Sequence, residues 1–162
     1  MRLILILQFL VLLTLANGTP VIVKKLLGDF LSQPLDGGII FFDGQPLFGP
    51  SKTIRGIVLS ILVTAEISAL IGLEWNVGAV AAAMAMIGDL FSSFLKRRLK
   101  MVPSSRATGL DQIPESLFPA LAVRSMLELT SLEIILVVTI FFAGEVILSR
   151  LFFKWHLRDR PF

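Results

Sequence analysis

The stretch "VGAVAAAMAMIGDLFSSFLKRRLK", residues 77–100, contains the features that decide the fold. Its first part, Val77 to Leu95, is almost entirely apolar or small, and four basic residues follow within the next five positions. A helix that spans a bilayer needs about 20 predominantly apolar residues. We therefore expect a membrane-spanning helix with a basic end. Asp89 lies inside the apolar run, and a carboxylate there needs a partner, an ion or a cavity.

The whole chain has the composition of a membrane protein. It has 162 residues, of which 55% are hydrophobic and 17% charged, with a mean hydropathy of +0.84. A soluble domain carries about 25% charged residues. The chain has no Cys and one His, which excludes disulfides and a structural zinc site. The length fits one domain, residues 1–162.

Five apolar stretches predict the helices of this domain. They cover about 3–23, 54–73, 77–95, 113–127 and 132–153. The second, third and fifth are long enough to span a bilayer, and the first is if its helix continues through Pro20. The fourth is short, carries Arg124 and needs packing against its neighbours. The predicted fold is an all-α integral membrane protein, a bundle of about five transmembrane helices.

The basic residues predict the orientation of the bundle. They concentrate in residues 24–56, in residues 96–112 and in the C-terminal tail, whereas the connectors 74–76 and 128–131 have no Lys or Arg. With five spans all three basic regions fall on one side, which the positive-inside rule makes cytoplasmic. We expect the N-terminus outside, the C-terminus inside, and a location in the cytoplasmic membrane. The same distribution explains the net charge of +3 without nucleic acid.

The first apolar segment has a second interpretation, and part of the third has a packing role. The N-terminal "MRLILILQFLVLLTLANG" resembles a secretory signal peptide, whose removal would leave four spans. The apolar pattern resumes at residues 20–23, which favours a retained helix. The small-residue run at residues 78–86 is typical of closely packed membrane helices.

Charged residues near the basic loops predict a polar site. On a helix, Asp89, Ser93, Lys96 and Lys100 share one face. The basic members could instead anchor the helix to lipid headgroups, and Asp89 could form an ion pair with another helix.

The motif "GLDQIPES", residues 109–116, adds two carboxylates beside the same loop. Asp111 and Glu115 are four residues apart and share a face if a helix has begun. Both could be helix-capping residues. Together with Asp89 they form a set of oxygen ligands of the kind that suits Mg²⁺.

The stretch "DGGIIFFDGQPLFGPSKTIRG", residues 36–56, is rich in turn residues and ends with Lys52 and Arg55. Backbone N–H groups beside such cations form anion sites, although the spacing is not that of a Walker A loop. A loop with solvated charges is the alternative. With the carboxylates it suggests a site for a polyphosphate and Mg²⁺, as nucleotidyl transfer requires.

Three motifs, "GPSKTIRG" (49–56), "GDLFSSFLKRR" (88–98) and "GLDQIPES" (109–116), resemble the CDP-archaeol synthases. These belong to the wider family of CTP-dependent phosphatidate cytidylyltransferases. The resemblance implies a Mg²⁺-dependent reaction in which CTP and a lipid phosphate give a CDP-lipid and pyrophosphate. In archaeal members the lipid is 2,3-di-O-geranylgeranylglycerol 1-phosphate.

The resemblance also implies roles for individual residues. The catalytic residues would be Asp89, Lys96 and Asp111. The metal ligands would be Asp89, Asp111 and Glu115. The substrate-binding residues would be Lys52, Thr53, Arg55, Ser93, Arg97, Arg98 and Gln112.

The chain departs from the family pattern in two places. Archaeal members typically show Asp-Gln-x-Asp, but here the second acid is Glu115, displaced by one residue. The broader phosphatidate enzymes carry Lys-Asp soon after Lys-Arg, and this chain does not. Two alternatives therefore stay open: a CDP-diacylglycerol synthase acting on phosphatidate, and a non-enzymatic transporter or assembly subunit. Glu66, Arg124 and Glu145 could line the path of such a transporter.

Overall fold

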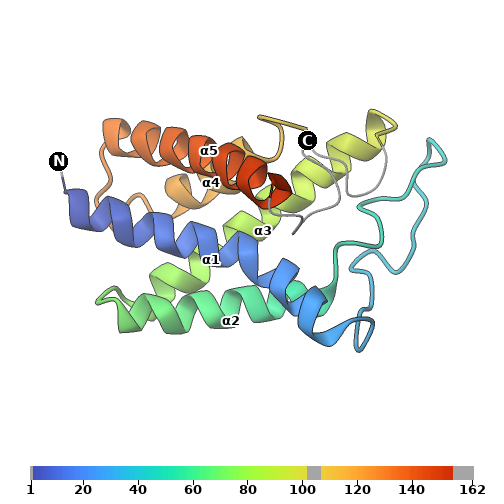
Figure 1. Ribbon diagram of the computed structural model, residues 1–162, viewed down its shortest axis with the longest axis horizontal. Helices are drawn as coiled ribbons and strands as arrows, with labels where there is room; N and C mark the ends of the chain where they lie inside the picture. The colour runs from blue at the N-terminus through green and yellow to red at the C-terminus, as the bar shows by residue number, and fades with distance from the viewer. Residues whose placement is uncertain (1, 102–106, 155–162) are drawn as a thin grey trace.

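The computed structural model describes residues 2–101 and 107–154 and is all-helical in architecture (Figure 1). Its five helices are α1 (Leu3–Leu27), α2 (Ile54–Leu70), α3 (Trp75–Arg98), α4 (Gln112–Ala122) and α5 (Ser131–Lys154). In the described part, β structure is limited to two isolated bridges within the loop that joins α1 to α2. The five helices predicted from the apolar stretches are thus present.

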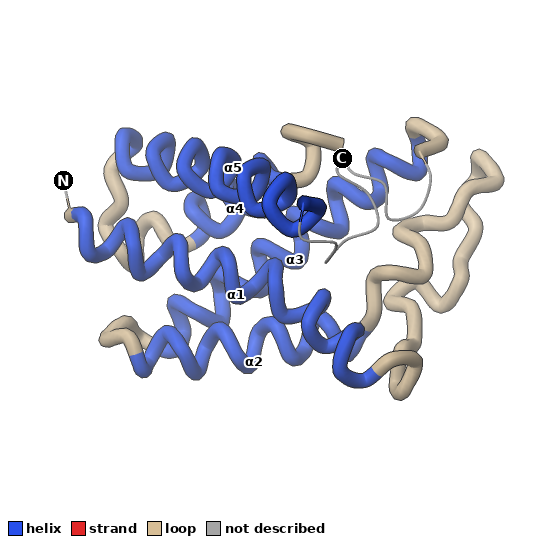
Figure 2. Tube along the Cα trace, viewed as in Figure 1, coloured by secondary structure: helices blue, strands red, loops and turns tan. Residues whose placement is uncertain are grey.

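The helices run alternately up and down, so the connections gather at two ends (Figure 2). The long loop 28–53 and residues 99–101, the described start of the α3–α4 connection, lie at one end, which we call the loop end. The short connections 71–74 and 123–130 lie at the opposite end. Both predicted basic loops therefore share the loop end.

Helix α3 lies at the centre of the packing, against α2 on one side and α4 on the other. The predicted small-residue run makes this possible. A Cβ added at Gly78 would lie 2.4 Å from the Thr64 carbonyl oxygen of α2. Ala81, Ala82 and Ala85 are fully buried along the same helix. The prediction of close packing at residues 78–86 is confirmed.

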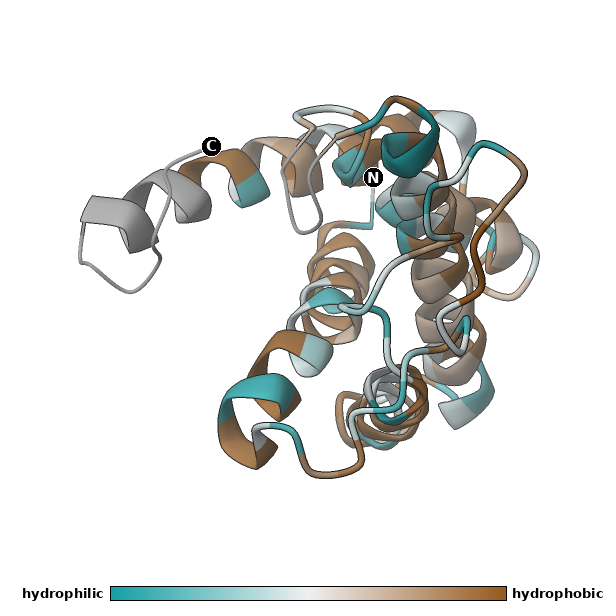
Figure 3. Cartoon of the chain, turned by 90° about the vertical axis from the view of Figure 1, so that its right-hand side faces the viewer, coloured by the Kyte–Doolittle hydropathy of each residue, from teal (hydrophilic) through white to brown (hydrophobic). Residues whose placement is uncertain are grey.

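Helix α2 is polar inside and apolar outside. It buries Gly56, Ser60, Thr64 and Ser68, one in each turn, while most of its large apolar side chains are exposed. Small and hydroxyl residues between helices are typical of membrane proteins, where lipid surrounds the apolar side. Most helical residues are hydrophobic, and hydrophilic residues are more frequent in the loops and near the helix ends (Figure 3).

The first helix continues through Pro20, which lacks the N–H that would bond the Ala16 carbonyl. The Ser60 hydroxyl of α2 donates to that carbonyl at 2.7 Å. Gly56 allows the approach, since a Cβ there would lie 3.3 Å from the Pro20 Cβ. A neighbouring serine thus satisfies the group that proline frees, as in other membrane helices.

The helices are not all long enough to form the five complete membrane spans that the sequence predicted. Among the described residues, α1 and α3 are long and apolar enough to cross a membrane. Helix α2 has 17 residues, at the short end of the spanning range. Helix α4 ends at Ala122 rather than near Leu127 and has only 11 residues, or about 16 Å of rise. The fourth segment therefore does not cross a bilayer as a helix.

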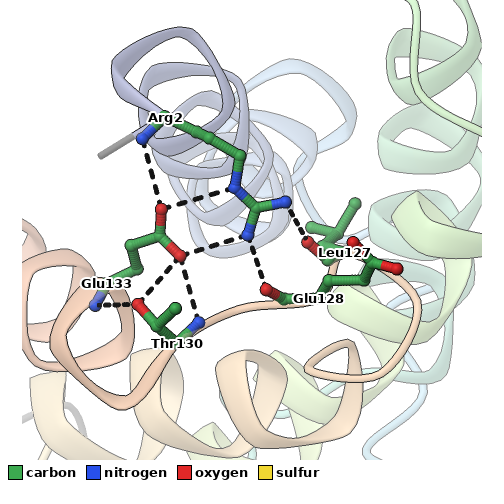
Figure 4. Close-up of polar contacts among 5 residues, drawn as sticks. All are labelled: Arg2, Leu127, Glu128, Thr130 and Glu133. Atoms are coloured by element: carbon green, nitrogen blue, oxygen red, sulfur yellow. Dashed lines mark hydrogen bonds and ion pairs between the residues drawn. The ribbon is translucent and has the colours of Figure 1, made fainter.

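Arg2 fastens the start of α1 at the opposite end (Figure 4). Its guanidinium lies 3.1 Å from Glu133 Oε2 and donates to the Leu127 carbonyl at 2.9 Å. Its backbone N–H donates to Glu133 Oε1 at 3.2 Å. Phe9 and Leu12 of α1 are fully buried in the core. These contacts make α1 part of the bundle.

Candidate active site at the loop end

Lys52 and Asp89 form the first ion pair of the site. Lys52 lies just before α2, and Asp89 lies on α3. The Lys52 Nζ is 2.5 and 2.6 Å from the two carboxylate oxygens of Asp89. Each side chain is 21% exposed, so the pair is open to water but mostly enclosed. Asp89 thus has a cation beside it, which an acid within an apolar helix requires.

Lys96 and Asp111 form the second ion pair. Their Nζ and Oδ1 atoms lie 2.8 Å apart, and both side chains are largely buried. Asp111 Oδ2 also accepts from the Ala107 backbone N–H at 3.1 Å. Asp111 precedes α4, but its side chain does not cap that helix. Its carboxylate instead joins α3 to the backbone that leads into α4.

Glu115 lies beside the first pair because α3 and α4 almost touch. A Cβ added at Gly88 would lie 2.4 Å from the Pro114 carbonyl oxygen and 2.8 Å from the Glu115 nitrogen. This contact places the buried Glu115 side chain within hydrogen-bonding reach of Asp89. Lys52 and Glu145 also act electrostatically on Glu115. Two carboxyl groups from different helices therefore meet next to one lysine.

The expected cluster of three metal ligands is reduced to a pair. No group of three or more Asp, Glu or His side chains in residues 2–101 and 107–154 lies close enough to hold a metal ion. Asp111 is held by Lys96, whereas Asp89, which is held by Lys52, lies beside Glu115. Mg²⁺ commonly binds one or two carboxylates and fills its other positions with water and substrate phosphate oxygens. Asp89 and Glu115 fit such a site.

Several predicted substrate-binding residues hold the backbone of the loop end. The Thr53 hydroxyl accepts from the Gly56 N–H at 3.3 Å and caps α2. Arg55 donates to the Gly28 carbonyl. Gln112 Oε1 accepts from the Gly109 N–H at 2.7 Å. A role for these three side chains in substrate binding stays a prediction.

Arg98 contacts the long loop and not the carboxylates of the site. Its guanidinium lies 4.6 Å from the Phe41 ring centre and 5.0 Å from that of Phe94. It also lies 3.1 Å from Asp43 Oδ1 and donates to the Pro46 carbonyl at 2.7 Å. The structure therefore shows Arg98 fastening the loop to α3, while its predicted contact with substrate stays a prediction.

The remaining predicted residues lie on α3. Ser93 and Arg97 are buried. The neighbouring Ser92 joins α3 to the next segment, donating to the Leu110 carbonyl at 2.7 Å.

Lys100 does not lie on the predicted polar face of α3. The helix ends at Arg98, and Lys100 has a φ of 55°. The Lys100 N–H donates to the Arg97 carbonyl at 3.0 Å, and the Met101 N–H donates to the Lys96 carbonyl at 2.9 Å. This is the Schellman pattern that ends a helix. The prediction that Lys100 continues the face is therefore wrong.

Asp36 organises the long loop, a role the sequence did not reveal. It is 5% exposed and accepts hydrogen bonds from the N–H groups of Gly38 at 3.0 Å, Phe48 at 2.9 Å and Gly49 at 2.9 Å. Burial alone would raise the pKa of Asp36, but these hydrogen bonds outweigh it and lower the pKa. The glycines after Asp36 were the available signal, since Asp-Gly favours a turn.

Two residues proposed to line a transport path do not do so. Glu66 and Arg124 are exposed on the outside of the bundle. Glu145 differs, because it lies near Glu115 at the site. The structure thus removes two of the three residues that motivated a transporter.

The apolar helices, with charged side chains paired at one end, define a small integral membrane protein. A family model described as "CarS-like: CDP-archaeol synthase" matches residues 75–160. The chain belongs to this family. It is 36% identical over 104 residues to a CDP-archaeol synthase of Hyperthermus butylicus, covering 60% of this chain and 59% of that relative.

Two further comparisons extend over most of the chain. A CDP-archaeol synthase of Sulfurisphaera tokodaii is 28% identical over 152 residues, which cover 90% of this chain and 88% of that protein. A solved structure described as an intramembrane enzyme for archaeal membrane lipid biosynthesis superposes with a TM-score of 0.74. It is 26% identical, and the match covers 88% of this chain and 90% of that one.

Proposed function

We propose that this chain transfers CMP from CTP to an archaeal-type lipid phosphate, 2,3-di-O-geranylgeranylglycerol 1-phosphate or a related lipid. The products are a CDP-archaeol-like lipid and pyrophosphate. One observation carries the proposal: two lysine–aspartate pairs and the buried Glu115 gather at the loop end of a chain in the CDP-archaeol synthase family. We further propose that this end faces the cytoplasm, where CTP is available.

The two ion pairs explain how the site accepts a highly charged substrate. Without substrate, Lys52 and Lys96 are balanced by Asp89 and Asp111. A triphosphate carries more negative charge than one carboxylate and accepts several hydrogen bonds from an ammonium group. Its phosphates therefore replace the two aspartates as the partners of the lysines, and the aspartates become available to other ligands.

The reaction needs alignment and charge neutralisation rather than a covalent enzyme intermediate. An oxygen of the lipid phosphate attacks the α-phosphorus of CTP. The bond from that phosphorus to the oxygen bridging to the β-phosphate breaks, and pyrophosphate leaves with the electron pair. Lys52 and Lys96 hold the phosphates in line and balance the charge on the leaving group.

Asp89 and Glu115 would hold Mg²⁺, which when bound would neutralise charge on the phosphates. Asp89 would first have to be released by Lys52, and Asp111 could join only after Lys96 releases it, because each carboxylate is occupied by its lysine.

An assay with purified protein, labelled CTP, Mg²⁺ and a panel of lipid phosphates tests the proposal. We expect a CDP-lipid from the geranylgeranyl ether substrate. Asp89→Asn should lower turnover at least about a hundredfold, the usual loss when a charge-stabilising group is removed. Glu66→Gln changes an exposed carboxylate outside the site and should leave turnover within about twofold of the parent.

Three outcomes would change the conclusion. Product from phosphatidate alone would favour the CDP-diacylglycerol synthase alternative. No product from any lipid would overturn the proposed activity. Near-normal turnover in a folded Asp89→Asn protein would remove Asp89 from the reaction.

A further inference from the structure

Two charged side chains, Glu66 of α2 and Arg124 of the turn after α4, face outward from the bundle. Both are exposed, and neither side chain forms a hydrogen bond or ion pair with any described residue. A charged side chain on the membrane-facing surface of a helix is costly unless it finds a partner. Neither residue belongs to the active site, so their partners must be sought outside the molecule.

Glu66 interrupts an apolar surface on the outer face of α2. Leu62 and Leu70 lie one turn before and one turn after it, on the same face of the helix, and are 55% and 79% exposed. Within the described part of the chain, α2 packs against α1 and α3 only. The face that carries Glu66 is therefore left uncovered.

Glu66 lies at the level of Gly78 of α3, near the opposite end. A Cβ added at Gly78 would lie 2.4 Å from the Thr64 carbonyl oxygen and 2.5 Å from the Ser68 Cβ, and these two residues flank Glu66 in α2. Gly78 follows the exposed Trp75 by three residues, or about 5 Å of helix rise. Tryptophan is enriched at membrane interfaces. Glu66 therefore lies just inside the edge of the bilayer.

Arg124 reaches the same level from the other side of α3. Gly88 lies ten residues beyond Gly78 along α3, or about 15 Å, and a Cβ there would lie 2.4 Å from the Pro114 carbonyl oxygen of α4. The chain then runs back toward the opposite end through α4 and the turn after it, and Arg124 follows Pro114 by ten residues. Arg124 thus returns to about the level of Gly78 and Glu66.

The two charges match in depth but lie on different sides of one molecule. Helix α2 has no contact with α4 or α5, because α1 and α3 lie between them. A second copy in the same orientation presents its own Arg124 at the depth of Glu66. Leu121 and Met126, which are 52% and 39% exposed, give the surface around Arg124 an apolar character like that around Glu66. We propose that the outer face of α2 docks against the α4 side of a second copy of this chain, with Glu66 paired to the Arg124 of that copy.

This contact joins two different faces, so it is heterologous rather than two-fold. Each copy keeps one face uncovered for a further copy, which closes a ring or extends a row in the membrane. The contact lies at the opposite end from the Lys52–Asp89 and Lys96–Asp111 pairs, so each active site stays complete within one copy. The inference therefore does not depend on the proposed activity.

Charge reversal in lipid vesicles tests the pairing with the full chain. Copies with Phe42→Cys, a 99% exposed position at the loop end, carry donor or acceptor dyes, and energy transfer between copies is followed as lipid is added. Glu66→Arg or Arg124→Glu alone places like charges together and should lower the affinity between copies at least about tenfold. The double variant restores the pair with its signs exchanged and should associate like the parent.

Asp29→Arg is the matched control, because it reverses an exposed carboxylate at the loop end, away from the contact. It should leave the association unchanged. Each reversal at the contact should keep the helical circular dichroism spectrum of the parent and whatever turnover the parent shows.

Cross-linking tests which faces meet, since the chain has no cysteine of its own. Leu62→Cys places a thiol on the outer face of α2, and Leu121→Cys places one on the exposed side of α4. With a short bis-maleimide, a mixture of the two variants should give a cross-linked dimer. Either variant alone should stay monomeric, because a heterologous contact brings no residue next to its own copy.

Four outcomes would overturn the inference. The parent shows no energy transfer at any dilution, in which case Glu66 and Arg124 contact only lipid headgroups. The single reversals leave the transfer unchanged. The double variant keeps its helices but does not regain transfer. Leu62→Cys copies cross-link to one another, which indicates a two-fold contact. Absence of CDP-lipid formation by the parent would overturn the proposed function and leave this contact in place.

Discussion

Each aspartate of the site is balanced by a lysine from another part of the chain. Lys52 and Asp89 are 37 residues apart, yet their charged atoms lie 2.5 Å from each other. Removing one charge of a mostly enclosed pair leaves the other without compensation, which is costly. The pairs therefore keep the site charged and folded when no substrate is bound. A substrate phosphate can replace a carboxylate without leaving a lysine unpaired.

Asp36 should contribute to loop stability in a pH-dependent way. Its hydrogen bonds require the carboxylate, and they lower its pKa below the ordinary value of 3.8. The stabilisation is therefore complete above about that pH and is lost as the pH falls through the lowered pKa. Asp36→Asn should raise the exchange rate of the Phe48 and Gly49 amides at pH 7, by about tenfold for a loss of about 1.4 kcal/mol.

Hydrogen–deuterium exchange of parent and variant at equal pH measures this effect, because the intrinsic exchange chemistry cancels. The difference between the two proteins should shrink below pH 3.8. Equal protection at pH 7 would show that Asp36 does not order the loop. A difference that persists undiminished at low pH would show that its charge is not involved.

The sequence indicated which residue types form the site but not which of them pair. Lys52, Asp89 and Asp111 could be found because they border basic loops or interrupt an apolar run. The sequence could not show that Asp89 pairs with Lys52 rather than with Arg98, because both cations lie at the loop end. Arg98 is instead drawn to Phe41 and Asp43 of the loop. Only the path of the long loop decides which of these two cations lies beside Asp89.

At the scale of helices, the contact between α3 and α4 positions Glu115. Gly88→Ala tests it, because the added Cβ would meet backbone atoms of Pro114 and Glu115 at 2.4 to 2.8 Å. Backbone cannot move aside as a side chain can, so the two helices must separate. We expect a loss of about 1–3 kcal/mol in unfolding free energy, as for other overpacked contacts. Turnover should also fall, because Glu115 would move away from Asp89.

Gly144→Ala is the matched control for that variant. Gly144 lies within α5, and a Cβ there would meet nothing within 4 Å. Alanine favours a helix over glycine by about 0.5–1 kcal/mol, so this variant should be equally or more stable. Denaturant titration in detergent, followed by circular dichroism, measures both. Equal behaviour of the two variants would show that the α3–α4 contact is looser than described.

Helices were predictable because length and hydropathy suffice to define them, whereas their ends and the long loop depend on distant contacts. The apolar run 77–95 became α3, Trp75–Arg98. The fourth segment ended early, at Ala122, where the chain turns toward α5. The order in loop 28–53 comes from bonds such as that from Gly49 to Asp36, 13 residues apart. No local pattern identifies such a pair.

At the scale of the whole molecule, the two ends of the bundle differ in their contacts and in their charge. The opposite end is closed by the Arg2–Glu133 contacts, which join α1 to the start of α5. The loop end carries the two lysine–aspartate ion pairs. Eight of the described basic residues lie in or next to the loop end, namely Lys24, Lys25, Lys52, Arg55, Lys96, Arg97, Arg98 and Lys100, whereas Arg2 and Arg124 lie at the opposite end. By the positive-inside rule this end should face the cytoplasm.

Cysteine labelling tests that orientation directly, because the chain contains no cysteine of its own. Phe42→Cys places a thiol at a 99% exposed position of the long loop, and Ser125→Cys places one in an exposed connector at the opposite end. In intact cells, a membrane-impermeant maleimide should label Ser125→Cys, and Phe42→Cys should react only after permeabilisation. The cysteine-free parent should remain unlabelled, and each variant should keep its turnover. Labelling of Phe42→Cys from outside would separate the site from cytoplasmic CTP, and the proposed reaction could not then proceed in the cell.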